Sequence, residues 1–285
     1  MTIFQLNREL QQLLAPVVGP DEARATVRLM FEQLLHIRPV DIVISGERVL
    51  EPETVSLMTE IAGRVADGEP VQYVLGRATF MGMSLKVTPA VLIPRPETSQ
   101  LVDLIVGQYA GRGDMRVLDI GTGSGCIAIA LSRALPFAVV TAADISDDAL
   151  CVARHNADAL HAAVSFVHAD AMRPVTLPDT QFDIIVSNPP YIAEREIADM
   201  DRRVFDHEPR TALFVPDSDP LCFYRAIAGY AMSHLSAGGG LFFEINPLYA
   251  GQLRAMLQND GWNDVQILRD FRGAERFATA YHPKK

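Results

Sequence analysis

The stretch VLDIGTGSGCIAIAL, residues 117–131, joins an apolar strand, a glycine-rich turn and the start of a helix. Gly121, Gly123 and Gly125 follow the strand at alternate positions, and apolar residues then continue with helical spacing. A dinucleotide-binding loop has the spacing G-x-G-x-x-G, which would place its third glycine at position 126. This chain has Cys126 there. The stretch therefore predicts a nucleotide-binding strand–loop–helix unit that departs from the dinucleotide form.

Short apolar runs and helical patterns alternate from this stretch to the end of the chain. Such alternation predicts a doubly wound, mainly parallel sheet with helices on both faces and ligands at the carboxyl ends of its strands. The last two runs have no helix between them, so we expect an antiparallel pair. The predicted strands are residues 116–121, 139–145, 164–170, 182–188, 239–245, 265–271 and 276–282, and the predicted helices 126–135, 147–160, 222–235 and 249–261.

The N-terminal region differs, because helical periodicity continues there without a strand pattern. It predicts a small helical bundle with helices over 2–15, 20–36, 39–45 and 52–67. Residues 71–97 are richer in β-branched and aromatic residues interrupted by glycine and proline, which suggests a short hairpin. The expected domains are 1–75 (helical), 76–110 (hairpin and linker) and 111–285 (catalytic).

Composition limits the class of protein. Of the 285 residues, 49% are hydrophobic and 21% charged, which is typical of a soluble globular chain. The net charge of −10 argues against a protein that binds bare nucleic acid through its whole surface, and it leaves open a local basic patch. The three cysteines have no metal-binding spacing, so we expect a reducing cytoplasm and no metal site. No signal peptide or membrane span is expected, and we expect a monomer.

Carboxylates at two strand ends suggest which nucleotide cofactor binds. Asp144 lies 23 residues after Gly121, at the end of the next strand, where an acid can hold both ribose hydroxyls. Asp119 precedes the loop and would repel a pyrophosphate, but it would attract a sulfonium and an amino group. This combination favours S-adenosylmethionine over NAD. Asp170, at the end of the third strand, is expected to meet the adenine amino group.

The stretch VSNPPYIA, residues 186–193, follows the fourth predicted strand and is poor in backbone donors. An NH2 group has two N–H bonds, and we expect the Asn188 side-chain oxygen and the Pro189 carbonyl to accept one each. Tyr191 can pack on the planar group that carries the nitrogen. Methyl transfer to an amide nitrogen would then depend on positioning rather than on a strong base or a covalent nucleophile.

The chain resembles the HemK/PrmC family of protein-glutamine methyltransferases over nearly its full length. The similar segments are GEPVQYVLG, LIPRPET, VLDIGTGSGCIAIAL, VSNPPYI, EPRTAL and DFRGAERFATA. The resemblance implies a Rossmann-like methyltransferase domain that methylates the glutamine of the Gly-Gly-Gln loop in class I peptide chain release factors, yielding S-adenosylhomocysteine. It also implies that the helical domain docks the release factor.

The resemblance assigns residues to each role. Asn188, Pro189 and Tyr191 would be catalytic, and Asn188, Pro189, Pro190 and Tyr191 would hold the glutamine. Some relatives carry an aromatic residue after the acid of the third strand, where this chain has Ala171; Asn246-Pro247 has no assigned role. The cofactor would contact Asp119, Gly121, Thr122, Gly123, Ser124, Gly125, Asp144, Asp170, Ala171 and Asn188.

Other functions share parts of this pattern. A ribosomal-protein glutamine methyltransferase resembles the catalytic half, although LIPRPET and the compact N-terminal block favour the release-factor branch. DNA adenine amino-methyltransferases also use N-P-P-Y, but they need a basic target-recognition region. A non-catalytic binding module would have little use for an intact N-P-P-Y, and Cys126 disfavours an NAD oxidoreductase.

Overall fold

The computed structural model describes residues 1–283 and divides into two compact units. One comprises Met1–Arg77 and Asp201–His207, and the other comprises Ala78–Met200 and Glu208–Lys285. The expected domain limits at residues 75 and 110 stay predictions. The grouping of Asp201–His207 with the N-terminal helices was not foreseen in the sequence.

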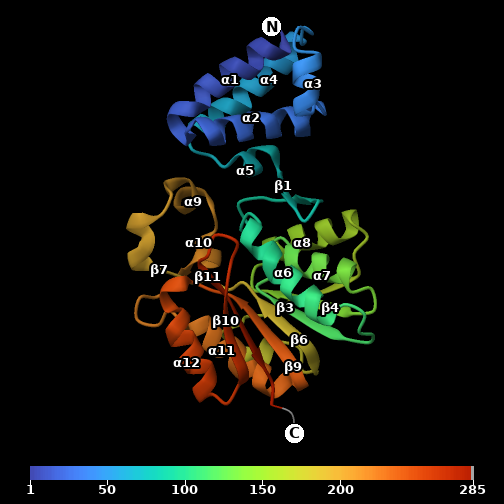
Figure 1. Cartoon of the computed structure of the whole chain (residues 1–285), viewed down its shortest axis with the longest axis vertical. Helices are drawn as coiled ribbons and strands as arrows, with labels where there is room; N and C mark the ends of the chain where they lie inside the picture. Colours follow the sequence, from blue (N-terminus) through green and yellow to red (C-terminus); the bar gives the residue numbers. More distant parts are fainter. Residues whose placement is uncertain (284–285) are drawn as a thin grey trace. The chain divides into compact units, whose positions relative to one another are not determined.

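The N-terminal unit is helical, as the periodicity predicted (Figure 1). Proline occupies the first turn of α2, α3 and α4, where its missing N–H costs no helical hydrogen bond. Leu6, Leu10, Phe31 and Met58 are buried in its core. The helices are α1 (Ile3–Val18), α2 (Pro20–Leu35), α3 (Pro39–Ile44), α4 (Pro52–Ala66), α5 (Val71–Leu75) and α9 (Arg202–His207).

The hairpin prediction over 71–97 needs a correction at its start. Residues 71–75 form helix α5, which ends at Gly76 in the left-handed conformation, so the aromatic and β-branched content of this segment was misleading. The hairpin itself consists of β1 (Arg77–Phe80) and β2 (Met83–Lys86). Met81 and Gly82 both have positive φ in its two-residue turn, as such tight turns require.

The second unit contains a seven-stranded sheet in the order β10-β11-β9-β6-β3-β4-β5. Only β11 pairs antiparallel with its neighbours, as expected for the closing pair. The strands are β3 (Arg116–Ile120), β4 (Val139–Asp144), β5 (Val164–His168), β6 (Phe182–Ser187), β9 (Leu235–Glu244), β10 (Asn263–Arg269) and β11 (Glu275–Tyr281).

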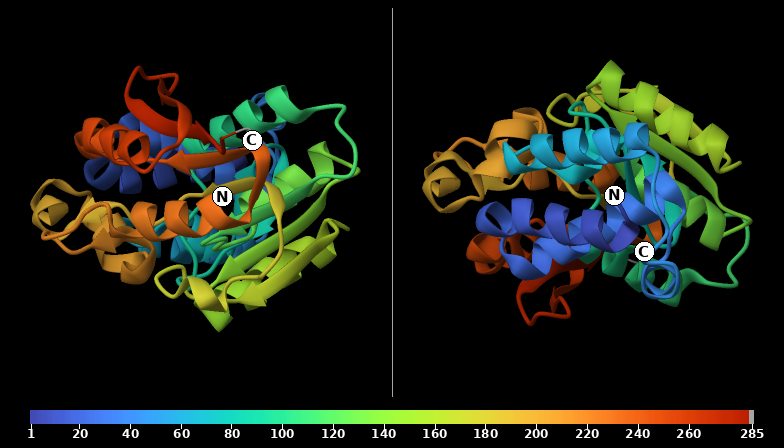
Figure 2. Two further views of the ribbon diagram at one scale, coloured as in Figure 1. Left: turned by 90° about the horizontal axis from the view of Figure 1, so that it is seen from below. Right: turned by 90° about the horizontal axis from the view of Figure 1, so that it is seen from above.

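Helices cover both faces of this sheet (Figure 2). Alternate strand residues point to opposite faces: Val117 joins the core under α6 and α7, whereas Leu118 joins the core under α11 and α12. These helices are α6 (Pro96–Tyr109), α7 (Cys126–Ala134), α8 (Asp147–Ala159), α11 (Cys222–His234) and α12 (Ala250–Asn259). The fold class is the predicted one.

Short elements complete the second unit around the carboxyl ends of the strands. Strands β7 (Ile192–Ala193) and β8 (Phe214–Val215) pair in parallel, so the segment after β6 lies beside the segment after α10 (Arg210–Leu213). Three 3-10 helices are η1 (Pro174–Thr176), η2 (Glu194–Asp199) and η3 (Pro247–Tyr249).

No helix among the described residues is long and apolar enough to cross a membrane. Within residues 1–283 no cluster of three or more potential ligand side chains is arranged to hold a metal ion.

Candidate active site

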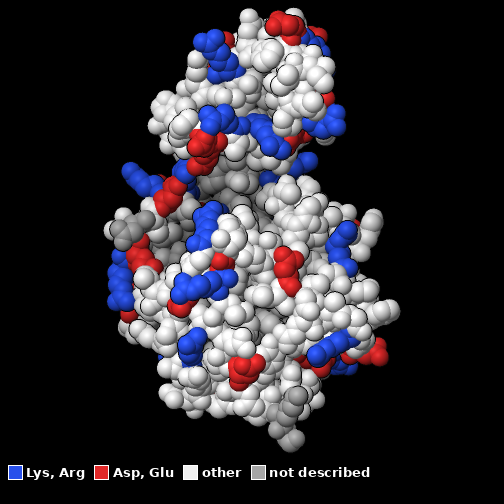
Figure 3. Space-filling model, in the orientation of Figure 1, with Lys and Arg blue, Asp and Glu red and all other residues white. Residues whose placement is uncertain are grey.

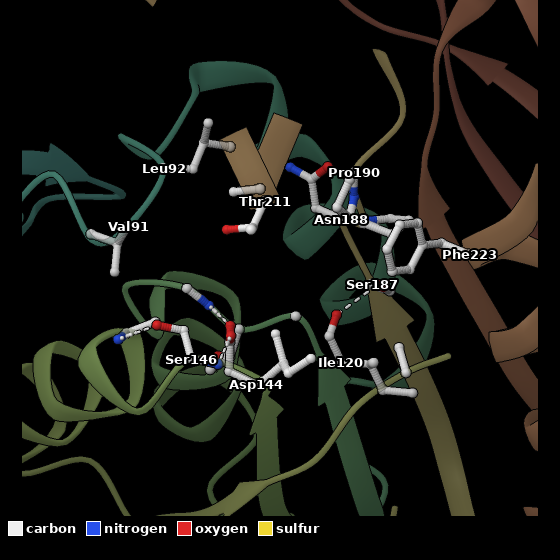
Figure 4. A pocket seen from close by; sticks show the side chains of 18 of the residues that line it. Val91, Leu92, Ile120, Asp144, Ser146, Ser187, Asn188, Pro190, Thr211 and Phe223 are labelled. Carbon is white, nitrogen blue, oxygen red and sulfur yellow. Dashed lines mark hydrogen bonds between the residues drawn. The ribbon is translucent and has the colours of Figure 1, made fainter. Parts of the chain in front are cut away.

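A pocket of about 440 Å³ lies at the carboxyl ends of β3, β4, β5 and β6. The chain leaves β3 for β4 on one side and returns to β6 on the other, so this is the switch point of the sheet, where doubly wound folds bind ligands. Figure 4 shows Asp144 and Ser146 on one side of the pocket and Asn188, Pro190 and Phe223 on the other. We call these the glycine-loop side (Gly121–Gly125 and Asp144) and the amide side (Asn188–Tyr191).

The glycine loop needs its glycines for two different reasons. Gly121, Gly123 and Gly125 all have positive φ, a backbone conformation that residues other than glycine adopt only with strain. A Cβ at Gly125 would lie 3.0 Å from Ile129 Cδ1 and 3.2 Å from Ala153 Cβ, so this glycine also permits close helix packing. A Cβ at Gly123 would meet nothing within 4 Å, so that glycine keeps the pocket open.

Asp144 is held by the backbone on both carboxylate oxygens. Gly123 N donates to Oδ2 at 2.8 Å and Ser146 N donates to Oδ1 at 3.0 Å. Burial raises the pKa of Asp144 above its usual value, whereas the backbone N–H groups lower it. Each oxygen keeps a lone pair, so the carboxylate can still accept two hydroxyl groups from a ligand in the pocket.

Asp119 lies behind the pocket rather than in its lining. Its side chain is fully buried, and Oδ2 accepts a hydrogen bond of 2.6 Å from Thr122 Oγ1, while Thr122 itself lines the pocket. Oδ1 is buried without a hydrogen-bond partner among the described residues. Burial raises the pKa of Asp119 from 3.8 to about 7. Direct contact between Asp119 and a cationic ligand, expected from its place before the glycine loop, stays a prediction.

The segment after β5 completes the glycine-loop side. Asp170 lines the pocket, but its carboxylate accepts from Met172 N at 2.8 Å and lies 3.7 Å from Arg173 Nε. Ala171 and Met172 also line the pocket, as does Ile145, which is 55% exposed. Met172 and Ile145 were not singled out in the sequence. They are apolar, and they are suited to pack against a flat ring.

On the amide side, the proline-containing stretch begins at Ser187, whose side chain is held by a hydrogen bond. Ser187 Oγ donates to the carbonyl oxygen of Ile120 at 2.6 Å, which ties the end of β6 to the end of β3. Asn188, Pro189 and Pro190 then line the pocket. Asn188 Nδ2 donates to Thr98 Oγ1 at 3.4 Å, so its Oδ1 is the atom available to a ligand.

Tyr191 is anchored through its hydroxyl and its carbonyl, both to residues of the buried interior. Its hydroxyl donates to Glu244 Oε1 at 3.3 Å, and its carbonyl accepts from Asn246 Nδ2 at 3.0 Å. The ring packs against the buried cluster under α11 and does not line the pocket. Asn246 also donates to Glu196, so this asparagine, which had no role in the sequence analysis, holds the chain that follows Pro190.

The segments IPRPET and EPRTAL meet at the pocket. Glu208 is buried, accepts from Arg95 Nη2 at 2.6 Å and also accepts from Ile93 N at 3.3 Å. Arg95 and Thr211 both line the pocket. Sequence analysis had no signal for the pairing, because 113 residues separate the partners.

The pocket fits S-adenosylmethionine on two observations. Gly121 and Gly123 leave open space where side chains would otherwise project, and the buried Asp119 Oδ1 is an acceptor without a donor. Acidic groups at Asp119, Asp144 and Asp170 give this side negative charge, which suits a cationic ligand. Such a sheet with such a pocket defines the class of S-adenosylmethionine-dependent methyltransferases.

Comparison with known proteins agrees and is more specific. Residues 100–211 match the methyltransferase small domain, and residues 5–76 match the PrmC N-terminal domain. Two curated relatives are named release factor glutamine methyltransferase. The one from Bacteroides thetaiotaomicron is 43% identical over 97% of this chain and 99% of its own, and the one from Flavobacterium psychrophilum is 34% identical over 97% and 98%.

A solved 16S rRNA methyltransferase of T. thermophilus, in complex with AdoMet and guanosine, shares the fold. The two are 20% identical, with a TM-score of 0.52 over 73% of this chain and 50% of that chain. The chain belongs to the family of release factor glutamine methyltransferases, and it is an S-adenosylmethionine-dependent protein-glutamine methyltransferase.

Proposed function

We propose that this enzyme methylates the side-chain amide nitrogen of the glutamine in the Gly-Gly-Gln motif of class I release factors. The observation that carries the proposal is the facing of Asn188–Pro190 and the glycine loop across one pocket. The relatives' names supply the release factor as the protein substrate.

The amide side suits a weak nucleophile. When bound, S-adenosylmethionine supplies an electrophilic methyl group on a sulfonium. Asn188 Oδ1 and the Pro189 carbonyl accept the two N–H bonds of the glutamine amide, which holds the nitrogen and directs its remaining electron density at the methyl carbon. As the nitrogen–methyl bond forms, the sulfur–methyl bond would break and S-adenosylhomocysteine would be the leaving group. The N-methylated amide would then lose one proton to water, which gives a neutral product.

Tyr191 is not the base in this mechanism. Burial and the neighbouring Glu244 raise the pKa of its phenol, so the hydroxyl keeps its proton and donates it to Glu244. Its ring instead supports the backbone of the stretch that carries Pro189 and Pro190.

The cofactor roles follow the geometry of the glycine-loop side. Asp144 would hold the ribose hydroxyls, and Asp170 and Ala171 would lie near the adenine. Asp119 would act through Thr122 and its negative charge. The backbone of Gly121–Gly125, with Thr122 and Ser124, would enclose the methionine part, and Asn188 would lie next to the methyl group.

The release factor would dock on the N-terminal helices. Val43 and Ile44 on α3 are 71% and 77% exposed and adjacent in sequence, so they provide apolar surface for a partner. Serine at both positions should raise KM for an intact release factor about thirtyfold, because interface side chains of this kind each contribute roughly 1 kcal/mol. KM for a short Gly-Gly-Gln peptide should not change.

Serine at Phe137 and Val139, which are 69% and 62% exposed in the other unit, is the matched control. Unchanged kinetics of the Val43/Ile44 variant on the intact factor would reject this docking surface.

We further propose a cytoplasmic monomer that binds neither nucleic acid nor membrane. The net charge of −10 supports this, as do the mixed acidic and basic side chains over the face of each unit in Figure 3.

The decisive experiment is incubation with labelled S-adenosylmethionine and, separately, a release factor, ribosomal proteins and duplex DNA. Label on the release factor, lost when its Gly-Gly-Gln glutamine is changed to alanine, is expected. Label on a ribosomal protein alone would favour the sister activity and overturn the proposal.

A further inference from the structure

Three side chains from three separate elements form a chain of hydrogen bonds behind the amide side. Asn188 follows β6, Thr98 lies in the first turn of α6, and Glu244 ends β9. Asn188 Nδ2 donates to Thr98 Oγ1 at 3.4 Å, and Thr98 Oγ1 donates to Glu244 Oε2 at 2.7 Å. Thr98 is 2% exposed and Glu244 is 1% exposed.

The chemistry of the groups fixes the direction of this chain. Burial raises the pKa of Glu244, whereas the hydrogen bonds from Thr98 and Tyr191 and the nearby Arg276 lower it and favour the ionised form. In that form the carboxylate only accepts, so the Thr98 hydroxyl gives its single hydrogen to Glu244. Toward Asn188 the same oxygen can then only accept. Asn188 must therefore offer its NH2 group to Thr98, which leaves its carbonyl oxygen as the free polar atom.

The opposite amide orientation would fail in catalysis. It would present the Asn188 NH2 group to the NH2 group of the glutamine, so two donors would face each other. We propose that Thr98 is a positioning residue for methyl transfer: with its hydroxyl directed by Glu244, it holds the Asn188 amide with its oxygen toward the substrate. This inference rests on the proposed function of Asn188 as an acceptor for the glutamine amide.

Glu244 stabilises the neighbouring part of the stretch as well. Its other oxygen accepts from the Tyr191 hydroxyl at 3.3 Å. One buried carboxylate thus fixes both Asn188, through Thr98, and Tyr191. The 3.4 Å contact between Asn188 and Thr98 is long for a hydrogen bond, and such contacts tighten when a substrate completes the site.

The test compares three substitutions at Thr98. Thr98→Val and Thr98→Ala remove the hydroxyl, whereas Thr98→Ser keeps it. In single-turnover methylation of a release factor at saturating cofactor, we expect about tenfold slower transfer for Val and Ala, as for the loss of one hydrogen bond. We expect Thr98→Ser to stay within about twofold, and cofactor affinity measured by calorimetry to stay within about twofold in every folded variant.

A double-mutant cycle shows whether Thr98 acts through Asn188. In an Asn188→Ala background, Thr98→Val should cause no further loss of rate. Additive losses, or a wild-type rate in both Thr98→Val and Thr98→Ala, would overturn the inference. Glu244→Gln should lower the rate about threefold, because its amide can either accept from or donate to Thr98 and so directs the hydroxyl less strictly. A wild-type rate there would overturn the part assigned to Glu244.

The proposed function of Asn188 and the positioning role of Thr98 can be rejected separately. A near wild-type rate in Asn188→Ala alone would reject the proposed function of Asn188. A slow Asn188→Ala variant with an unaffected Thr98→Val variant would reject only the positioning role.

Discussion

On the glycine-loop side of the pocket, Asp144 is held by backbone N–H groups that lie 2 and 21 residues away in sequence. On the amide side, by contrast, Asn188 and Tyr191 are held by side chains that lie 90 and 53 residues away. The first arrangement is built almost entirely from one strand–loop–helix–strand unit. The second needs α6, β6 and β9 to come together before any of its side chains is fixed.

The difference has a consequence for substitutions. A backbone-held carboxylate keeps its place when neighbouring side chains change, so its loss should affect mainly the ligand that it contacts. A group held by remote side chains depends on every member of its network, so changes outside the pocket should reach the reacting centre.

The largest expected effect is on the amide side. Asn188→Ala removes one acceptor from the glutamine NH2 group, and loss of one preorganised group at a reacting centre costs about 10²–10³ in rate. Single-turnover rates on a release factor would measure it. Cofactor affinity should change far less, because the ribose and loop contacts remain.

If Asn188→Ala methylates at nearly the wild-type rate, the acceptor account of the amide side is wrong.

Asp144→Ala should weaken cofactor binding much more than it slows methyl transfer, which is the reverse of the pattern expected for Asn188→Ala. It removes two charged acceptors from the glycine-loop side, and at roughly 1.5 kcal/mol for each hydrogen bond this weakens cofactor binding about 10²-fold. Calorimetry on the folded variant would measure the affinity. The transfer rate at saturating cofactor should stay within about tenfold of the wild type.

The matched control is Asp144→Asn, which keeps the shape of the side chain and one acceptor oxygen. Its affinity for the cofactor should lie between those of the wild type and of Asp144→Ala. A folded Asp144→Ala variant with unchanged affinity would remove Asp144 from the cofactor site.

The same contrast explains what the sequence could predict. The alternation of strands and helices, the glycine loop and Asp144 are local patterns, and the structure brings them together at the expected sheet edge. Asn188, Pro189 and Pro190 arrive there for the same reason, since β6 lies next to β3.

The support behind these residues could not be predicted from local patterns. Thr98 and Glu244 lie 146 residues apart, and nothing in their local sequence indicates that they touch. The sequence predicts that the Tyr191 ring packs on the substrate amide, which stays a prediction, but it gave no sign that the hydroxyl donates to Glu244. Helix α5 was missed because residues 71–75 have the composition of a strand.

Tyr191 offers a smaller test of the amide side. Tyr191→Phe keeps the ring and loses only the bond to Glu244, so we expect less than about tenfold slower transfer. Tyr191→Ala removes the partly buried ring and should be much slower and less stable. Single-turnover rates and thermal unfolding of both variants would distinguish a packing role from base catalysis, in which Phe would be as damaging as Ala.

Asp119 gives the smallest expected effect and tests the glycine-loop side through pH. The carboxyl lies behind the lining, so its charge acts on a bound cation indirectly, an effect of about 1 kcal/mol or roughly fivefold in affinity. Its pKa of about 7 means that the charge is present at pH 8 and mostly lost at pH 6. Wild-type affinity for S-adenosylmethionine should therefore fall by about that factor as the pH drops through 7, whereas Asp119→Asn should bind weakly at both pH values.

Stability should change in the opposite direction. Because folding raises the pKa of Asp119 from 3.8 to about 7, the folded state binds this proton more tightly than the unfolded state. The stabilisation is therefore full below about pH 4 and is lost as the pH rises toward 7. Thermal unfolding of the ligand-free enzyme should show this decline between pH 4 and 7, and Asp119→Asn should flatten it. The wild type and Asp119→Asn could instead show the same change of unfolding temperature with pH and the same pH dependence of cofactor binding. That result would show that this buried carboxyl takes no part in holding the cofactor.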